Sequence, residues 1–277
     1  MHVASAPVVD LRTERDNVPI RPPLKWAGGK RWQLEHLLGR WKLHSHRRLV
    51  EPFAGGLAVA LGLRPAQALL NDINPHLINF YRWLKAGFAP QIDPKNEAKY
   101  YYRARRRFNA LLQKNLGTTA ESAHLFWYLN RTGYNGLCRF NRKGEFNVPF
   151  GRYNTLVYDF DFSLYKAIFQ HWEFTNVHFS ELALDDDDFV YADPPYDVDF
   201  TNYSQGGFSW DDQCRTAEWL ARHPGPVVLS NQATPRILEL YGDNGFRVEP
   251  LDAPRRISCT GDRRPAKEVL AFRNLPE

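Results

Sequence analysis

The stretch DFVYADPPY, residues 188–196, joins a short apolar run to an aspartate, two prolines and a tyrosine. The run has the length and composition of a buried β-strand. Two consecutive prolines cannot continue a central strand, because each lacks the backbone N–H that a neighbouring strand needs. The strand therefore ends here, and we expect it to carry Asp193 to the carboxyl edge of a sheet.

Six further runs read as strands, at residues 48–54, 67–72, 176–180, 226–231, 246–251 and 268–274. Helical patterns lie between several of them, which predicts a mostly parallel sheet covered by helices on both faces. Only a loop fits between the last two runs, so these are expected to form an antiparallel pair at the sheet edge. The predicted fold class is α/β, with a mostly parallel seven-stranded sheet and an antiparallel last strand.

The sequence changes character between residues 75 and 152, where it becomes helical in pattern, aromatic and basic. We interpret this stretch as a helical subdomain inserted after the second strand. The predicted division is a flexible N-terminal tail (1–19), a catalytic domain built from residues 20–74 and 153–277, and the inserted subdomain (75–152). The tail is polar and proline-rich, without the apolar segment of a secretory signal.

Composition narrows the class of protein. No apolar run reaches the roughly 18 residues of a membrane span, so no membrane contact is expected, and the cysteine content favours a reducing cytosol. The three cysteines are far apart and form no Cys-x-x-Cys pair, so neither a zinc site nor a disulfide framework is expected. The acidic run at 184–189 is interpreted as a solvated strand entry, because adjacent aspartates cannot all point at one ion. No metal is predicted.

The chain is moderately basic, with a formal net charge of +5. Its basic residues gather at 101–109, 131–153 and 254–267, interleaved with tyrosine, phenylalanine, asparagine and glycine. This mixture suits phosphate contacts combined with base stacking. For the first cluster, one solvated face of a helix is an equally good explanation.

Two motifs follow the first two strands. The stretch EPFAGG (51–56) places glycines between a strand and a helix, where a backbone can approach a ligand closely. The stretch LLNDIN (69–74) ends a strand at Asp72, and an acid there can accept from ribose hydroxyls. Asn74 followed by Pro75 makes a better helix start, which frees Asp72 for a ligand. The dinucleotide fingerprint G-x-G-x-x-G is absent, which disfavours a nicotinamide enzyme.

An N-terminal loop, LKWAGGK (24–30), resembles the end of a phosphate loop but lacks two of its requirements. Leu24 stands where the first glycine belongs, and Arg31 replaces the serine or threonine, so an NTPase is disfavoured. Trp26 and Lys30 remain as an aromatic plate and a cation. They could hold a ligand with a ring or a carboxylate, and surface structure explains them equally well.

The DPPY stretch offers a ring-binding site. The Asp193 carboxylate and the following carbonyls are acceptors, the prolines fix their direction, and Tyr196 presents a flat face. Such a site suits a planar ring with an exocyclic amino group. A Pro-Pro turn that merely closes a strand is the competing interpretation.

Four motifs, LKWAGGK, EPFAGG, LLNDIN and ADPPY, occur in the order seen in DNA adenine-N6 methyltransferases of the Dam family (D12 class). The segment LNRTGYNGLCRFNRKGEFNVPFGRY (129–153) resembles the DNA-reading segment of that family over nearly its whole length. The resemblance implies a Rossmann-like methyltransferase fold with an inserted DNA-recognition subdomain. It also implies methyl transfer from S-adenosylmethionine to N6 of an adenine flipped out of double-stranded DNA, by a cytoplasmic, nucleoid-associated monomer that needs no metal.

The resemblance also assigns residues to the cofactor and to catalysis. The cofactor would be held by Trp26, Lys30, Asp72 and Asp193, with Phe53, Gly55 and Gly56 lining its methionine part. The catalytic stretch would be Asp193, Pro194, Pro195 and Tyr196. Asp193 and the Pro194 carbonyl would accept from the N6 amino group while Tyr196 stacks on the adenine.

Seven residues are expected to bind DNA by the same resemblance: Lys25, Tyr134, Asn135, Leu137, Arg139, Pro149 and Arg152. Tyr134 would enter the gap left by the flipped base, with Asn135 beside it, and Arg139 would make a bidentate contact to guanine. Leu137 and Pro149 would touch a thymine methyl group, and Lys25 the outer guanine. Arg152 would serve a phosphate or a structural role. This set predicts a GATC site.

Two alternatives remain open on the sequence. One is the same fold with a different recognition sequence or a single-stranded substrate. The other is a catalytically inactive DNA-binding homologue, against which the intact DPPY stretch, Asp72 and Lys30 argue. Two departures from the family pattern concern the base pocket: SNQA at 230–233 stands in place of SNH, and the loop 197–210 is shorter than in some members.

Overall fold

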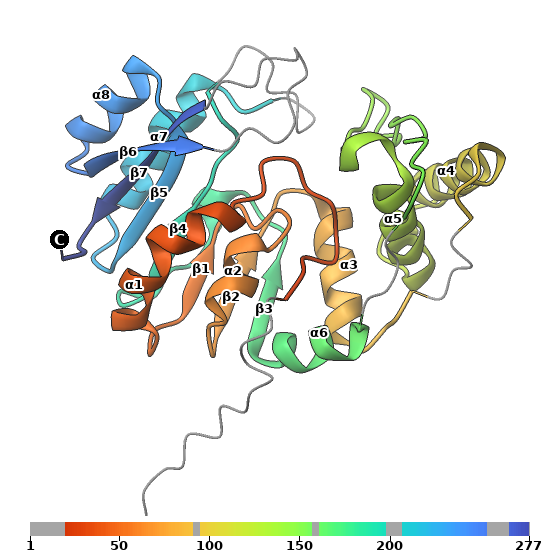
Figure 1. Cartoon of the computed structure of the whole chain (residues 1–277), viewed down its shortest axis with the longest axis horizontal. Coiled ribbons are helices and arrows are strands. Elements are labelled where there is room, and N and C mark those ends of the chain that lie inside the picture. The colour runs from red at the N-terminus through yellow and green to blue at the C-terminus, as the bar shows by residue number, and fades with distance from the viewer. Residues whose placement is uncertain (1–19, 91–94, 157–160, 198–206, 254–265, 277) are drawn as a thin grey trace, which may run out of the picture.

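A seven-stranded sheet forms the centre of the computed structural model, which describes residues 20–90, 95–156, 161–197, 207–253 and 266–276 (Figure 1). The strand order is β3-β2-β1-β4-β5-β7-β6. The strands are β1 (Leu49–Glu51), β2 (Ala68–Asn71), β3 (Trp172–Thr175), β4 (Phe189–Ala192), β5 (Val227–Gln232), β6 (Arg247–Ala253) and β7 (Ala266–Arg273). The first five pair in parallel, and β7 runs antiparallel to both β5 and β6. The predicted α/β methyltransferase-like fold is confirmed.

Helices cover both faces of the sheet, so the central strands are buried on both sides. One core cluster joins the sheet to α1 (Leu34–His44), α2 (Ala58–Leu63), α3 (Pro75–Lys85) and α6 (Phe162–Ile168). A second cluster packs α7 (Trp210–Ala221) and α8 (Pro235–Asp243) against the opposite face. Because β1 to β5 run parallel, their carboxyl ends lie together at one edge of the sheet, between the two helix layers.

The basic, aromatic part of the chain lies at one end of the molecule. It contains α4 (Ala98–Gln113) and α5 (Ala120–Thr132), which Figure 1 shows beyond α3. The segment after α5 folds back on itself through short bridges, Gly133 to Phe150 and Phe140 to Phe146; we call residues 133–150 the hairpin. The first core cluster continues from the sheet into this part, through Phe108, Phe126 and Phe146. The domain division remains a prediction, and the tail (1–19) lies outside the described residues.

One predicted strand is wrong. Residues 176–180 were expected to form the third strand, whereas β3 is Trp172–Thr175 and a 3₁₀ turn covers Phe179–Glu181. The alternation that packs is Trp172 and Phe174, which are buried, while Glu173 faces solvent. Val177 lies beyond the strand end, where its N–H donates to the Asn71 side chain at 3.1 Å. A side-chain acceptor therefore replaces the ladder there.

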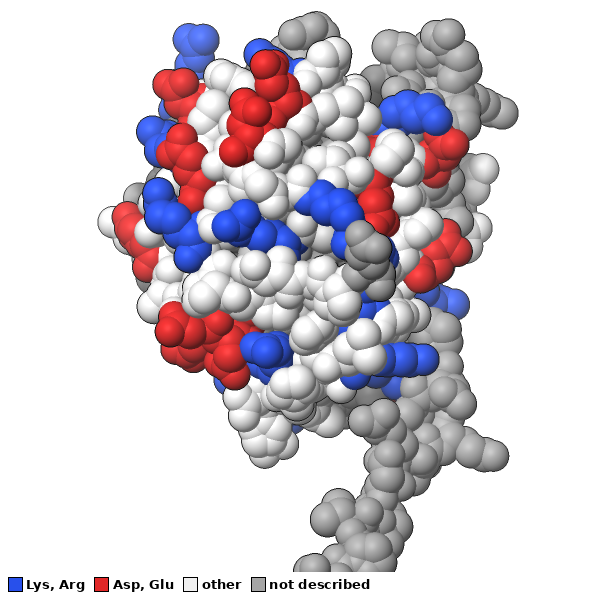
Figure 2. Space-filling model, turned by 90° about the vertical axis from the view of Figure 1, so that its left-hand side faces the viewer, with Lys and Arg blue, Asp and Glu red and all other residues white. Residues whose placement is uncertain are grey.

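The sides of the molecule differ in charge. Figure 2 shows a face with acidic and basic residues interspersed. Ion pairs also cross between elements, and Arg40 of α1 meets Glu249 of β6 at 2.9 Å. Residues 98–153 instead hold eleven lysines and arginines against two acidic residues. Within the described residues, no helix combines the length and apolarity needed to cross a membrane.

Candidate active site

The end of β4 places Asp193 at the carboxyl edge of the sheet, directly before the two prolines. One carboxylate oxygen, Oδ2, lies 3.2 Å from the Lys30 ammonium. The other, Oδ1, is buried and has no hydrogen-bond partner among the described residues. Burial raises the pKa of Asp193 to about 6, against the opposing effect of Lys30. The site thus contains an unsatisfied acceptor, which is the feature expected where a donor binds.

Lys30 links the N-terminal loop to this stretch. Its side chain is almost fully buried, and its Nζ donates to the Gly28 carbonyl at 2.7 Å. The same ammonium lies 4.5 Å from the centre of the Tyr196 ring. Lys30, which the sequence singled out in the N-terminal loop, therefore meets Asp193 and Tyr196 of the DPPY stretch.

A buried polar network holds Tyr196. Its hydroxyl donates to Glu268 of β7 at 2.5 Å and lies 3.4 Å from Ser230 of β5. Gln33 donates to both Ser230 and Glu268, at 2.9 and 3.2 Å, and accepts from Tyr191 at 2.7 Å. Sequence reasoning missed Gln33 and Glu268. A glutamate inside the apolar run EVLAFRN was the available signal, since charges are rarely buried without a partner.

A second network fixes the Pro195 carbonyl. Gln213 of α7 donates to it at 2.7 Å, and Gln213 in turn accepts from Asn231 at 3.0 Å. Asn231 also donates to the Tyr241 hydroxyl at 2.9 Å. Ser230 and Asn231, the two residues of SNQA that match the family pattern, therefore support the DPPY stretch. Gln213 is another residue that the sequence did not reveal, because its partner is a main-chain atom.

Asp72 lies where β2 ends, beside the glycines that follow β1. Its carboxylate accepts from the backbone N–H of Gly55 at 3.0 Å and of Asn74 at 2.9 Å. Asn74 caps α3 as predicted, with Pro75 in the first turn. Asp72 therefore does not cap α3, and its carboxylate instead holds the glycine turn at Gly55. Burial raises the pKa of Asp72. The contact with Gly55 ties the ends of two neighbouring strands together.

The glycine turn receives Trp26 at close range. A Cβ added to Gly56 would lie 2.7 Å from the Trp26 Cβ, and one added to Gly55 would lie 2.8 Å from the indole Nε1. In the structure it is therefore Trp26 that approaches this backbone, although the sequence suggested a ligand. Phe53 packs at the same edge, against Phe179 with ring centres 5.5 Å apart.

Two more residues at this edge escaped the sequence analysis. Glu51, the last residue of β1, is buried and its Oε1 has no hydrogen-bond partner within the described part of the chain. Burial raises the pKa of Glu51 well above its usual range. Ile73, next to Asp72, is an apolar side chain left 55% exposed. An unsatisfied acid and an exposed apolar surface are both compatible with a ligand that has polar and flat parts.

Comparison with known proteins shows to which family the chain belongs. The family model of the D12 class N6 adenine-specific DNA methyltransferases matches residues 26–257. The chain belongs to this class. It is therefore an adenine-specific DNA methyltransferase of the Dam family that uses S-adenosylmethionine, as the motifs predicted.

Several relatives are similar over most of this methyltransferase. It is 37% identical to the DNA N-6-adenine-methyltransferase of Escherichia phage P1, over 91% of this chain but only 35% of that protein. It is 36% identical to the Retron Ec67 DNA adenine methylase of Escherichia coli, over 90% of both chains. A type II methyltransferase of Lactococcus lactis subsp. cremoris is 33% identical, over 87% of this chain and 91% of the relative.

The methyltransferase presents its predicted DNA-binding residues on the hairpin. Tyr134, Asn135, Arg139 and Pro149 are exposed, and Leu137 is half-buried. The Tyr134 N–H donates to the Pro149 carbonyl at 2.9 Å, which brings the two arms together. Arg139 donates to the Asn147 side chain at 2.9 Å. Arg152, just beyond the hairpin, is exposed with a positive φ of 51°.

Lys25 joins this group although it is distant in sequence. Its Nζ donates to the Arg131 carbonyl at 2.9 Å and lies 3.5 Å from the centre of the Tyr153 ring. Burial, together with the nearby Arg131, lowers the pKa of Lys25 to about 8. A Cβ added to Gly136 would lie 2.4 Å from the Lys25 Cβ, so the hairpin packs directly on this residue.

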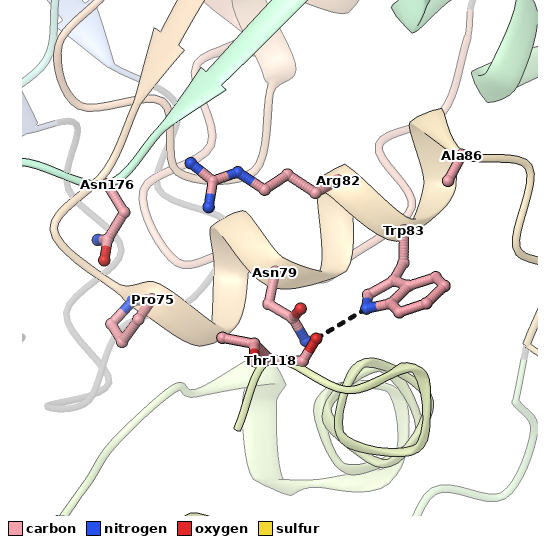
Figure 3. Close-up of a pocket in the computed structure, with 7 residues that line it drawn as sticks. All are labelled: Pro75, Asn79, Arg82, Trp83, Ala86, Thr118 and Asn176. Atoms are coloured by element: carbon pink, nitrogen blue, oxygen red, sulfur yellow. Dashed lines mark hydrogen bonds between the residues drawn. The ribbon is translucent and has the colours of Figure 1, made fainter. Parts of the chain in front are cut away.

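A groove of about 310 Å³ runs along α3 of the methyltransferase (Figure 3), lined by Pro75, Asn79, Arg82, Trp83, Ala86, Thr118 and Asn176. Two of its polar side chains donate hydrogen bonds to main-chain carbonyls. Arg82 donates to the Phe174 carbonyl at 2.8 Å, and Trp83 donates to that of Thr118 at 3.0 Å, drawn as a dashed line. None of the predicted site residues lines this groove.

Proposed function

We propose that this methyltransferase acts on duplex DNA at GATC, by transferring the methyl group to N6 of an adenine flipped out of the helix. The observation that carries the proposal is Asp193 Oδ1, buried without a hydrogen-bond partner in the described part of the chain, on a carboxylate that meets the same Lys30 ammonium as the Tyr196 ring. In open α/β sheets ligands bind at the carboxyl edge, where Asp193 lies. A flipped adenine offers the N6 donor that the acceptor lacks, and N6 cannot be reached inside the stack.

The residues at the ends of β1 and β2 fit the cofactor. Trp26, Phe53, Gly55, Gly56 and Asp72 would hold it, and Lys30 and Asp193 border the same space. The cofactor, when bound, supplies a methyl group on a positively charged sulfur. Asp72 retains acceptor capacity beyond its two backbone hydrogen bonds, because each carboxylate oxygen has two lone pairs. Ile73 offers an exposed apolar surface beside it.

The DPPY stretch would orient the target. Asp193 Oδ1 and the Pro194 carbonyl accept from the N6 amino group, and Tyr196 stacks on the base. Gln213 holds the next carbonyl, that of Pro195, so the turn keeps one conformation. Transfer is direct, without a covalent enzyme intermediate: N6 would gain the methyl group as the methyl–sulfur bond breaks, S-adenosylhomocysteine would leave, and one N6 proton would pass to solvent. Positioning and fixed dipoles lower the barrier, which is the usual contribution of a preorganised site.

The hairpin and its surroundings would bind the duplex. Eleven basic residues against two acidic ones between residues 98 and 153 attract the phosphate backbone. Tyr134, 49% exposed at the start of the hairpin, is available to fill the gap left by the flipped base. Arg139 would contact guanine, and such a bidentate contact is worth about 1–3 kcal/mol of discrimination. Asn135, Leu137, Pro149 and Lys25 would complete the reading of GATC, and Arg152 would contact a phosphate.

We further propose that the protein acts as a monomer without a metal ion. Residues 75–152 would form its DNA-recognition subdomain, and residues 20–74 with 153–277 its catalytic domain. The close packing of Lys25 on Gly136 supports a fixed relation between the two parts.

The test is transfer of labelled methyl groups to short duplexes. We expect labelling of a duplex that contains GATC, and not of a matched duplex in which GATC is replaced by GTTC, whose complementary strand still contains adenine. Equal labelling of both would overturn the GATC assignment and favour another recognition sequence. A protein that binds the duplex but labels neither would be the inactive homologue.

A further inference from the structure

The segment from Pro23 to Lys30, which we call the strap, touches both halves of the proposed site. Figure 1 shows this part of the chain, in red, running between the sheet and α5. At its start, Trp127 of α5 donates to the Pro23 carbonyl at 3.2 Å. Farther along, Trp26 packs on the glycine turn and Lys30 reaches Asp193. The strap thus carries Lys25, proposed for DNA, immediately before Trp26, proposed for the cofactor.

Asn130 of α5 fixes the strap between these two residues. Its Oδ1 accepts from the Lys25 N–H at 2.8 Å, and its Nδ2 donates to the Lys25 carbonyl at 2.7 Å. Asn130 is only 1% exposed. One primary amide therefore satisfies both main-chain groups of Lys25, which an apolar or a charged side chain of the same size cannot do. The carbonyl that Asn130 holds belongs to the peptide unit that leads into Trp26.

We propose that Asn130 is a positioning residue that couples cofactor binding to DNA binding, through the backbone of Lys25 and Trp26. This inference rests on the proposed placement of the two ligands at Trp26 and at the hairpin. α5 ends immediately before the hairpin, so a change there reaches the strap through Asn130 and through the Gly136 contact. A ligand that holds either end of the strap then favours the conformation that the other ligand binds.

The chain contains a matched control in Asn109 of α4. Its amide clamps Phe146 in the same way, because the Phe146 N–H donates to its Oδ1 at 2.8 Å and its Nδ2 donates to the Phe146 carbonyl at 3.1 Å. Phe146 lies in the hairpin and not in the strap. Asn109→Ala should therefore loosen the DNA-reading segment without disturbing the connection to Trp26.

The experiment measures binding of S-adenosylhomocysteine by calorimetry, with and without a saturating GATC duplex. For the unaltered protein we expect the duplex to tighten this binding at least about fivefold, the lower end of usual coupling between sites. The cofactor product should tighten duplex binding by the same factor, because such coupling is reciprocal. Asn130→Ala should bring both factors close to one. Asn109→Ala should weaken only the binding of the duplex and keep the coupling factor.

The outcomes separate this inference from the proposed function. If the unaltered protein binds both ligands independently, or if Asn130→Ala retains the full factor, the coupling role is wrong while the function stands. If the unaltered protein binds neither ligand, the proposed function fails. Should Asn130→Ala not fold, Asn130→Asp keeps the size and the acceptor, loses the donor to the Lys25 carbonyl and adds a negative charge opposite that carbonyl. It is expected to lose coupling as well, and full coupling in that variant would contradict the inference.

Discussion

The two oxygens of Asp193 have different surroundings, and this difference explains how one carboxylate can serve two purposes. Oδ2 faces the Lys30 ammonium at 3.2 Å, which anchors the side chain. Oδ1 is buried without a partner among the described residues, and it is the oxygen that we propose accepts from the substrate. An unsatisfied buried acceptor costs folding free energy, on the order of 1–3 kcal/mol, so its persistence indicates a functional constraint.

The raised pKa of Asp193 predicts a pH dependence for methyl transfer. Only the ionised carboxylate can accept through both oxygens, and burial places its pKa at about 6. We therefore expect kcat/KM to be constant between about pH 7 and the Lys25 pKa of about 8, and to fall about tenfold per unit below pH 6. Duplex binding, measured over the same range as a control, should not follow this profile. A rate that stays constant down to pH 5 would contradict the role given to Asp193.

Among the elements, the turn between β1 and α2 is tightly constrained, because another segment packs onto its backbone. Gly56 has no Cβ where the Trp26 side chain lies, and Asp72 holds the turn from the neighbouring strand. The requirement at Gly56 is space alone, since its φ is not among the positive values. The ends of β1 and β2 and the strap are thus packed together as one unit.

We expect Gly56→Ala to reduce both stability and cofactor affinity. The added Cβ would lie 2.7 Å from the Trp26 Cβ, a fixed part of that side chain, and overpacking of this kind costs roughly 1–3 kcal/mol. Gly39→Ala in α1 is the control, because nothing lies within 4 Å of its added Cβ and alanine favours helices by about 0.5–1 kcal/mol. Urea unfolding, which gives the free energy of unfolding of each variant, checks both values. Equal stability of the two variants would mean that Trp26 does not pack as described.

At the scale of the whole molecule, one core connects the proposed active site to the hairpin proposed to bind DNA. The first core cluster extends from the sheet residue Leu70 through α3 to Phe146 in the hairpin. Charge is divided differently: residues 98–153 are strongly basic, whereas the face shown in Figure 2 mixes both signs. A duplex should therefore approach the α4–α5 end, where its phosphates meet an attractive field.

Ligand binding should stabilise this connected body as a whole. At a concentration about 100 times its dissociation constant, S-adenosylhomocysteine would add about 2.7 kcal/mol of stability, which raises Tm by roughly 5–10 °C. ATP is the control, because it shares the adenosine part but the strap lacks a phosphate-binding loop. Differential scanning calorimetry measures both. An equal shift with ATP, or none with S-adenosylhomocysteine, would contradict the proposed cofactor site.

Much of the fold could be predicted from the sequence because its signals are local. Apolar runs that end in a carboxylate mark strands, and the carboxyl ends of parallel strands share one edge, so Asp72 and Asp193 were expected near each other. The third strand was misplaced by a few residues, because the run 176–180 looks as apolar as Trp172–Thr175. Only packing decided which of the two joined β2.

The sequence by itself determined the type of sheet, the strand ends that carry Asp72 and Asp193, and the family to which the chain belongs. The tertiary structure alone decided which residues support them. Glu268 meets Tyr196 across 72 positions, and Asn130 meets Lys25 across 105. Hydrogen bonds between such distant residues leave no periodic pattern, because they depend on how elements pack and not on neighbours along the chain.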